Sequence, residues 1–247
     1  MAEAPGAAPA GADGTLLPAA FAPALLAQGA VPVGSVEITF LDHASFLIRS
    51  PGGATAITDY NGIERAPAAP DIVTMNNAHS THYTDTVEPG VKYVLRGWDP
   101  GGGVPVHDLF QLDMHVRNVP TNLRDVGGTR IAGNSIFVFE VAGLCIAHLG
   151  HLHHLLEPMH LDELGPIDVL MVPADGTYAL SQELMARVVD QIRPAVVIPM
   201  HYFSQERLAR FLGFIADDYP PEWLDGPTIV LSRALLSPRR SVVSPER

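Results

Sequence analysis

The chain is short of basic residues, and this shortage limits the partners that it can bind. It has 247 residues, with 15 lysines and arginines against 27 acidic residues, and a formal net charge of −12. A field of that sign repels phosphate backbones and anionic membrane surfaces, so we expect no nucleic-acid partner. Long apolar runs are missing too. No stretch reaches the roughly 20 apolar residues of a membrane-spanning helix, so we expect no membrane span.

Cysteine is almost absent. Cys145 is the single cysteine and lies in an apolar run, where we interpret it as a small buried residue on a strand. One cysteine excludes an intrachain disulfide and a Cys-x-x-Cys metal or redox motif. This usage favours a cytoplasmic location. Export after trimming of a precursor stays open, although the first basic residue is Arg49 and the sequence as it stands has no secretory signal.

The composition is that of a globular chain. Hydrophobic residues make up 47% and charged residues 17% of the sequence, enough for a sizeable core. Residues 1–32 are dominated by alanine, proline and glycine, and we predict a flexible arm there. We expect one domain over residues 33–236 and a polar tail over residues 237–247.

Short β-rich runs fill the first part of the predicted domain, and helical patterns appear after about residue 155. Strands are predicted over residues 36–41, 45–49, 54–58, 71–75, 91–95, 114–119, 135–141, 144–148, 169–172, 195–198 and 228–231. Helices are predicted over 157–164, from an N-cap at Ser181 to the residue before Pro194, and over 205–216. This order predicts sheets covered by helices on their outer faces.

Several of the 11 histidines stand where predicted strands end. They are His79, His82, His148, His151, His153, His154 and His201. An imidazole is the commonest metal ligand in proteins, and several imidazoles at neighbouring strand ends can converge on one ion. The grouping therefore predicts a metal site.

At this point the sequence resembles a known family. Residues 38–48, with the letters ITFLDHASFLI, look like the opening strand pair of the metallo-β-lactamase superfamily, in its lactonase and phospholipase-like branch. Further matches over 71–85, 134–154, 168–178 and 193–202 extend the resemblance to about residues 35–235. It implies an α/β fold, a four-layer αββα sandwich in one domain. It also implies two metals held at the strand ends by a His-x-His-x-Asp-His motif, a lone His, a bridging Asp and a final His.

This chain departs from that pattern at several ligand positions. Within residues 77–82, Asn77 and Thr81 stand where the motif has His and Asp, while His79 and His82 are kept. Asn122 stands where the lone His is expected, and His151 replaces the bridging Asp. A neutral imidazole does not bridge two cations as a carboxylate does, so we predict that the dinuclear centre is lost.

We therefore predict a mononuclear site. Its ligands are His82, His151 and His201, with His79 as fourth ligand, proton shuttle or base, and its ion is one divalent metal, zinc first, with manganese or iron as alternatives.

Other residues are assigned roles around this site. His79, His148 and Asp59 form the predicted catalytic set, in which His148 lies behind the ligands and Asp59 orients an imidazole. His43, Asn77, Asn122 and His153 are possible outer-sphere partners or reserve ligands. For His43 and Asp59, a packed histidine and a turn-forming aspartate are the structural alternatives.

The function implied by the resemblance and this ligand set is that of a metal-dependent hydrolase. It would use metal-activated water on an ester, lactone or phosphodiester of a small molecule. One alternative is a catalytically silent protein that keeps the fold and serves binding or scaffolding. Another is a metal-binding or oxygen-handling protein with histidine-only ligation of iron or manganese.

Overall fold

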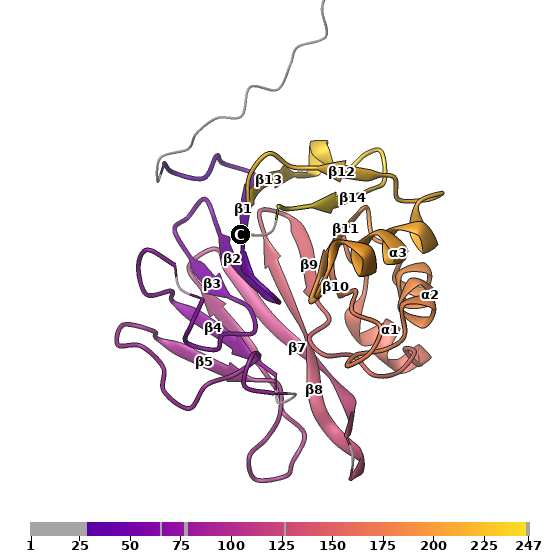
Figure 1. Cartoon of the computed structure of the whole chain (residues 1–247). Helices are drawn as coiled ribbons and strands as arrows, with labels where there is room; N and C mark the ends of the chain where they lie inside the picture. The colour runs from indigo at the N-terminus through magenta and orange to yellow at the C-terminus, as the bar shows by residue number, and fades with distance from the viewer. Residues whose placement is uncertain (1–28, 65, 77–78, 126, 246–247) are drawn as a thin grey trace, which may run out of the picture.

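The computed structural model describes residues 29–64, 66–76, 79–125 and 127–245, which form two β-sheets packed face to face with helices on one outer side (Figure 1). This arrangement confirms the predicted single-domain α/β sandwich.

The first sheet has six strands in the order β13-β1-β2-β3-β4-β5. Their bounds are β1 Ser35–Asp42, β2 Ser45–Arg49, β3 Thr55–Ile57, β4 Ile72–Met75, β5 Tyr93–Arg96 and β13 Thr228–Ser232. The turn at residues 50–54 joins β2 to its antiparallel neighbour β3, as the Pro-Gly-Gly sequence predicts.

The second sheet has eight strands in the order β12-β14-β11-β10-β9-β8-β7-β6. Their bounds are β6 Asp108–Gln111, β7 Met114–Asp125, β8 Gly128–Val141, β9 Leu144–His148, β10 Val169–Pro173, β11 Val196–Met200, β12 Pro221–Trp223 and β14 Arg240–Val243. β7 and β8 pair antiparallel over most of their length and form a long hairpin.

One apolar core joins the two sheets. β1 and β2 contribute Ile38, Phe46 and Ile48 to it, and β8 contributes Phe137 and Phe139. Each of these side chains is at most 1% exposed. Successive residues of a strand point to opposite faces, so the alternate residues of β8 face the helices instead.

Three α-helices cover the outer face of the eight-stranded sheet: α1 Pro158–Leu164, α2 Gln182–Ile192 and α3 Gln205–Ile215. α2 and α3 contribute Met185, Val188 and Phe211 to a second core with Ile136 and Val138 of β8. α2 and α3 therefore each bury one apolar face against the sheet. A 3₁₀ turn, η1 Arg233–Leu235, follows β13.

The helix ends follow the sequence signals. The Oγ of Ser181 accepts a hydrogen bond from the N–H of Leu184, which confirms the predicted cap of α2. Arg193 ends α2 with a left-handed backbone, just before Pro194. Ser204 caps α3 in the same way as Ser181 caps α2.

Loops, rather than helices, cover the outer face of the six-stranded sheet in the part of the chain that the structure describes. Leu47, Ile57 and Val73 point to this face, and Tyr83 and Trp98, from the loops after β4 and β5, pack against them. None of the described helices is long and apolar enough to cross a membrane.

The polar tail predicted over residues 237–247 is wrong in its central part. Residues 240–243 form β14, which pairs in parallel with β11 and with β12. Ser241, Val242 and Val243 are buried, and Ser241 Oγ donates to the main-chain oxygen of Tyr219. The sequence does not predict this strand, because its apolar part is only two valines long and follows two arginines. β6 and β12, both edge strands of three or four residues, were also not predicted.

The strand directions collect the candidate site residues. β9, β10 and β11 run parallel, and β3 and β4 run parallel in the other sheet. The segments that follow these strands therefore leave each sheet at one edge, and they carry most of the predicted ligands.

Candidate metal centre

Four histidines from three segments of the chain bring their side chains close together. His79 and His82 follow β4, His151 follows β9 and His201 follows β11. Their ligand nitrogens all lie within 4.8 Å of one another, and among the described residues no carboxylate belongs to this group. His82, His151 and His201 are buried, whereas His79 is exposed. Solvent therefore reaches the cluster from the side of His79.

The nitrogens meet in a way that fits one cation. His79 Nε2 lies 3.1 Å from His151 Nε2, and His201 Nε2 lies 3.1 Å from His82 Nε2. Imidazoles that bind a tetrahedral zinc at about 2.0–2.1 Å have nitrogens roughly 3.3 Å apart. Burial, and then the charges of His82 and His201, lower the pKa of both His79 and His151. Both imidazoles are therefore neutral at pH 7, the form that binds a metal.

Asp59 holds His82 in place. His82 Nδ1 donates to Asp59 Oδ2 at 2.6 Å, which leaves Nε2 for a metal. Asn76 Nδ2 donates to Asp59 Oδ1 at 3.0 Å, and Asn76 Oδ1 accepts from the N–H of Ser135 in the second sheet. Burial alone raises the pKa of Asp59, but the imidazoles of His148 and His82 and the two hydrogen bonds bring it below its usual value. Asp59 thus contacts the side of His82 that faces away from the cluster nitrogens, where it can orient the imidazole.

Asp175 faces His201. Its Oδ1 lies 3.3 Å from His201 Nδ1, and its Oδ2 accepts from the N–H groups of Thr177, Tyr178 and Ala179 in the turn after β10. Burial raises the pKa of Asp175, but His201 and these N–H groups lower it by more, so the carboxylate is ionised.

His151 also has a partner behind it, and this partner is another histidine, His153. His151 Nδ1 is 2.6 Å from His153 Nε2, and His153 Nδ1 accepts from the N–H of Arg124 in β7. Burial and then the charge of Arg124 lower the pKa of His153 to about 4. The main chain of His151 is also fixed, because its N–H donates to Asn134 Oδ1 at 2.8 Å. His153 is therefore an outer partner of His151 rather than a reserve ligand.

His148 does not fit the catalytic role that we predicted. It is fully buried, its Nε2 donates to the oxygen of Ala44 at 2.9 Å, and its Nδ1 accepts from the N–H of Gly150. Both ring nitrogens are thus used by the main chain, and neither is left for a metal or a proton of the reaction. Its side chain bridges the two sheets below the site.

Asn122 does not serve the cluster either. Its Oδ1 accepts from the N–H of Ala132, across the β7–β8 hairpin, where the register shifts between Thr121 and Leu123. Its own N–H donates to His154 Nε2. The predicted weak metal donor is therefore part of the hairpin. Asn77 lies outside the described residues.

His43 packs beside the cluster without joining it. Its ring centroid lies 4.1 Å from that of His201 and 5.3 Å from that of His82. Its main-chain oxygen accepts from the N–H of His201 at 2.8 Å. Burial, followed by His201 and His82, lowers the pKa of His43 to about 3. His43 therefore supports the backbone of His201.

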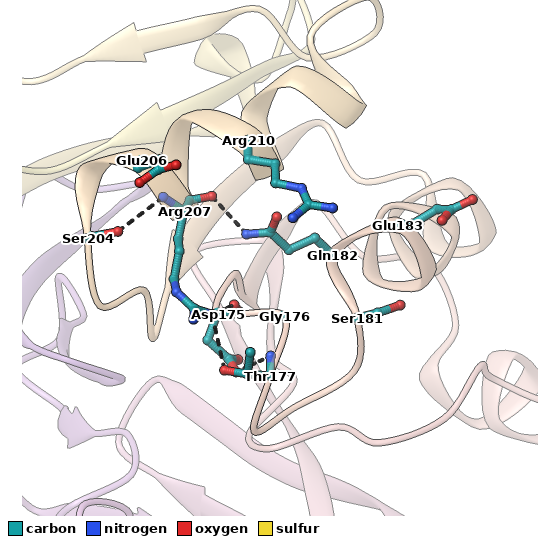
Figure 2. A pocket seen from close by; sticks show the side chains of 10 residues that line it. All are labelled: Asp175, Gly176, Thr177, Ser181, Gln182, Glu183, Ser204, Glu206, Arg207 and Arg210. Atoms are coloured by element: carbon teal, nitrogen blue, oxygen red, sulfur yellow. Dashed lines mark hydrogen bonds between the residues drawn. The ribbon is translucent and has the colours of Figure 1, made fainter.

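Asp175 also lines a cavity of about 390 Å³ between the N-terminal turns of α2 and α3 (Figure 2). Arg207 Nη1 donates to the main-chain oxygen of Asp175 at 2.5 Å and to Thr177 Oγ1 at 3.1 Å. Gln182 Nε2 donates to the oxygens of Ala174 and Arg207. None of the four cluster histidines lines this cavity. Its polar contacts hold the turn that carries Asp175.

The sequence analysis missed three supporting residues. Asn76 fixes Asp59, Asn134 fixes His151, and Asp175 faces His201. Asp175 stands two residues after the end of β10. Its position directly after a buried strand was a usable signal, because such positions in parallel sheets point towards the ligand edge. Asn76 and Asn134 carry no comparable pattern, since their partners are distant in the sequence.

A family model for the beta-lactamase superfamily domain matches residues 37–201, well over half of the chain. The chain therefore belongs to the metallo-β-lactamase superfamily, as the resemblance implied.

Its relatives include UPF0173 metal-dependent hydrolases. The protein of Carboxydothermus hydrogenoformans is 24% identical over 74% of this chain and 91% of its own length. That of Thermococcus onnurineus is 29% identical over 68% of this chain and 84% of its own length. Among solved structures, a metallo-β-lactamase superfamily protein of Thermotoga maritima superposes with a TM-score of 0.62 at 26% identity, over 86% of this chain and all of that chain.

Proposed function

We propose that this chain is a metal-dependent hydrolase for an ester, lactone or phosphodiester of a small molecule, with one divalent cation held by His82, His151 and His201. Zinc is the expected ion, with manganese or iron as alternatives. The observation that carries the proposal is the convergence of four imidazoles in a group without a carboxylate. The relatives named metal-dependent hydrolases agree with it.

The single-ion form follows from the donor set. Where the superfamily pattern has a bridging aspartate, this chain has His151, which offers one nitrogen to the cluster. Asn122, at the position of another first-metal ligand, is used by the hairpin. Four imidazoles within 4.8 Å of one another suit one cation and leave too few donors for a second.

When bound, such a cation lowers the pKa of a coordinated water towards about 7 and polarises the bond to be cleaved. The chain supplies orientation for this chemistry. Asp59 fixes the ring of His82 through Nδ1, and Asp175 faces the ring of His201. Both carboxylates are buried and ionised, so they also balance the charge of a cation in a site of low polarity.

His79 is the residue assigned to proton transfer. It is the one exposed member of the cluster, and it is neutral at pH 7 because burial and the neighbouring imidazoles lower its pKa. Its Nε2 points at the other ligand nitrogens, so it can accept a proton there or bind as a fourth ligand.

The test uses the tag-free full chain loaded with zinc, assayed on one aryl ester, one lactone and one phosphodiester. We expect turnover of at least one class, its loss on chelation and its return on reloading. His201→Ala is expected to lose turnover. His115→Gln is the matched control, since His115 lies between Asp108 and Glu140, outside the cluster. Full zinc occupancy without turnover of any class would overturn the hydrolase and favour the silent binding protein.

A further inference from the structure

Two exposed aromatic side chains stand together at the edge of the histidine cluster. Tyr178 is 60% exposed and Phe203 is 53% exposed. Their ring centroids are 5.6 Å apart and their planes meet at 72°. The two rings therefore form a corner, and more than half of each side chain is exposed to solvent.

This corner touches the cluster on its accessible side. The ring of Tyr178 lies 5.9 Å from that of His79, the exposed ligand candidate. The ring of Phe203 lies 5.2 Å from that of His201 and 5.7 Å from that of His43. The corner therefore borders the cluster next to His79, its exposed member.

The main chain that carries the corner is also fixed close to the cluster. The N–H of Tyr178 donates to Asp175 Oδ2, so the turn that faces His201 also carries this ring. Phe203 stands two residues after His201 and directly before Ser204, whose side chain caps α3. A ring placed in this way loses little conformational freedom when it binds a ligand.

On the basis of the proposed function, we propose that Tyr178 and Phe203 bind the substrate, which carries a flat aromatic or conjugated group beside the bond that is cleaved. Aromatic rings bind one another best edge to face or offset, and a 72° corner offers both contacts to one flat group. A neutral flat group suits a chain with a net charge of −12 better than an anionic one does.

The test compares two hydroxamic acids with the same metal-binding head: 3-phenylpropanohydroxamic acid and 3-cyclohexylpropanohydroxamic acid. Their affinities for the zinc-loaded full chain are measured by calorimetry. We expect the phenyl compound to bind about three- to tenfold more tightly. In Tyr178→Leu and Phe203→Leu, which keep an apolar side chain but remove the ring, the preference should fall towards equality. Phe214→Leu, at an exposed position of α3, is the control that should keep it.

Equal affinities in the unmodified chain, no binding of either compound, or a preference that survives both substitutions at unchanged zinc content would each overturn the proposal. A phenyl preference in a chain that hydrolyses nothing would support the binding corner and refute the proposed function. Hydrolysis without a phenyl preference would do the reverse.

Discussion

The two sides of the metal centre hold their histidines in different ways. His82 and His201 face buried carboxylates, those of Asp59 and Asp175. His151 faces an imidazole, that of His153. A carboxylate can only accept, so Asp59 fixes the proton of His82 on Nδ1 and leaves Nε2 free for a metal. Asp175 lies 3.3 Å from His201 Nδ1, and its negative charge favours a proton on that nitrogen.

The imidazole partner lacks this directing effect. His153 Nδ1 accepts from the N–H of Arg124, so a neutral His153 carries its proton on Nε2, the nitrogen that points at His151. This polarity opposes the proton arrangement that ligation through His151 Nε2 requires. His82 and His201 are thus prepared for a cation, whereas His151 has to adjust when the cation binds.

The same contrast extends to the neighbouring hairpin. The N–H groups of Asn122 and Arg124, two residues apart in β7, donate to His154 and His153. Two histidines on the side of His151 therefore bind the main chain of β7, whereas carboxylates support the imidazoles of His82 and His201.

Loss of a carboxylate should have the largest effect. Asp59→Asn is expected to weaken zinc binding about 100-fold, because an amide accepts less strongly and its charge is gone. Asp175→Asn is expected to cost about tenfold, since the contact of Asp175 with His201 is longer, at 3.3 Å against 2.6 Å. Competition with a coloured chelator measures both affinities.

Asp71→Asn is the matched control, because Asp71 pairs with Lys92 away from the cluster. Equal zinc affinity in Asp59→Asn and Asp71→Asn would show that the carboxylate behind His82 does not contribute to zinc binding, and would refute the contrast with His151.

Replacing the imidazole partner should work in the opposite direction. His153→Glu is expected to tighten zinc binding about tenfold, because a carboxylate would accept from His151 Nδ1. His154→Glu adds the same charge one residue further along the chain and separates a contact effect from a general charge effect. Unchanged or weaker binding in His153→Glu, by the same chelator assay, would contradict the assigned polarity.

The smallest effect is expected at Asn122, which stands where the superfamily pattern has a histidine. Asn122→Ala removes the hydrogen bond to the N–H of Ala132, so we expect a loss of about 1 kcal/mol in unfolding free energy. Zinc content should not change. Urea denaturation and elemental analysis check the two parts, and loss of zinc would show that Asn122 belongs to the metal site.

Much of the fold could be predicted because its signals are local. The strand pair of β1 and β2, the Ser181 cap and the buried face of α2 all depend on residues that are close together in the sequence. β14 could not be recognised in this way. It is short, it begins at the second of two arginines, and its stability comes from parallel partners distant in the sequence.

The candidate site also has features that the sequence could predict and features that it could not. The grouping of His79, His82, His151 and His201 could be predicted from strand ends and from the superfamily pattern, and the structure brings these four together. The contacts of His148 and Asn122 could not, because main-chain groups from distant strands use their polar atoms. The sequence shows which side chains could bind a metal, but not which of them are already hydrogen-bonded to the main chain.

The most direct test of the central claim is the number of metal ions per chain. Elemental analysis of the tag-free full chain, reconstituted with zinc, is compared with that of His151→Ala. The account predicts about one zinc per chain, lost in the variant. Two tightly bound ions per chain, or none after reconstitution with zinc, manganese or iron, would contradict it.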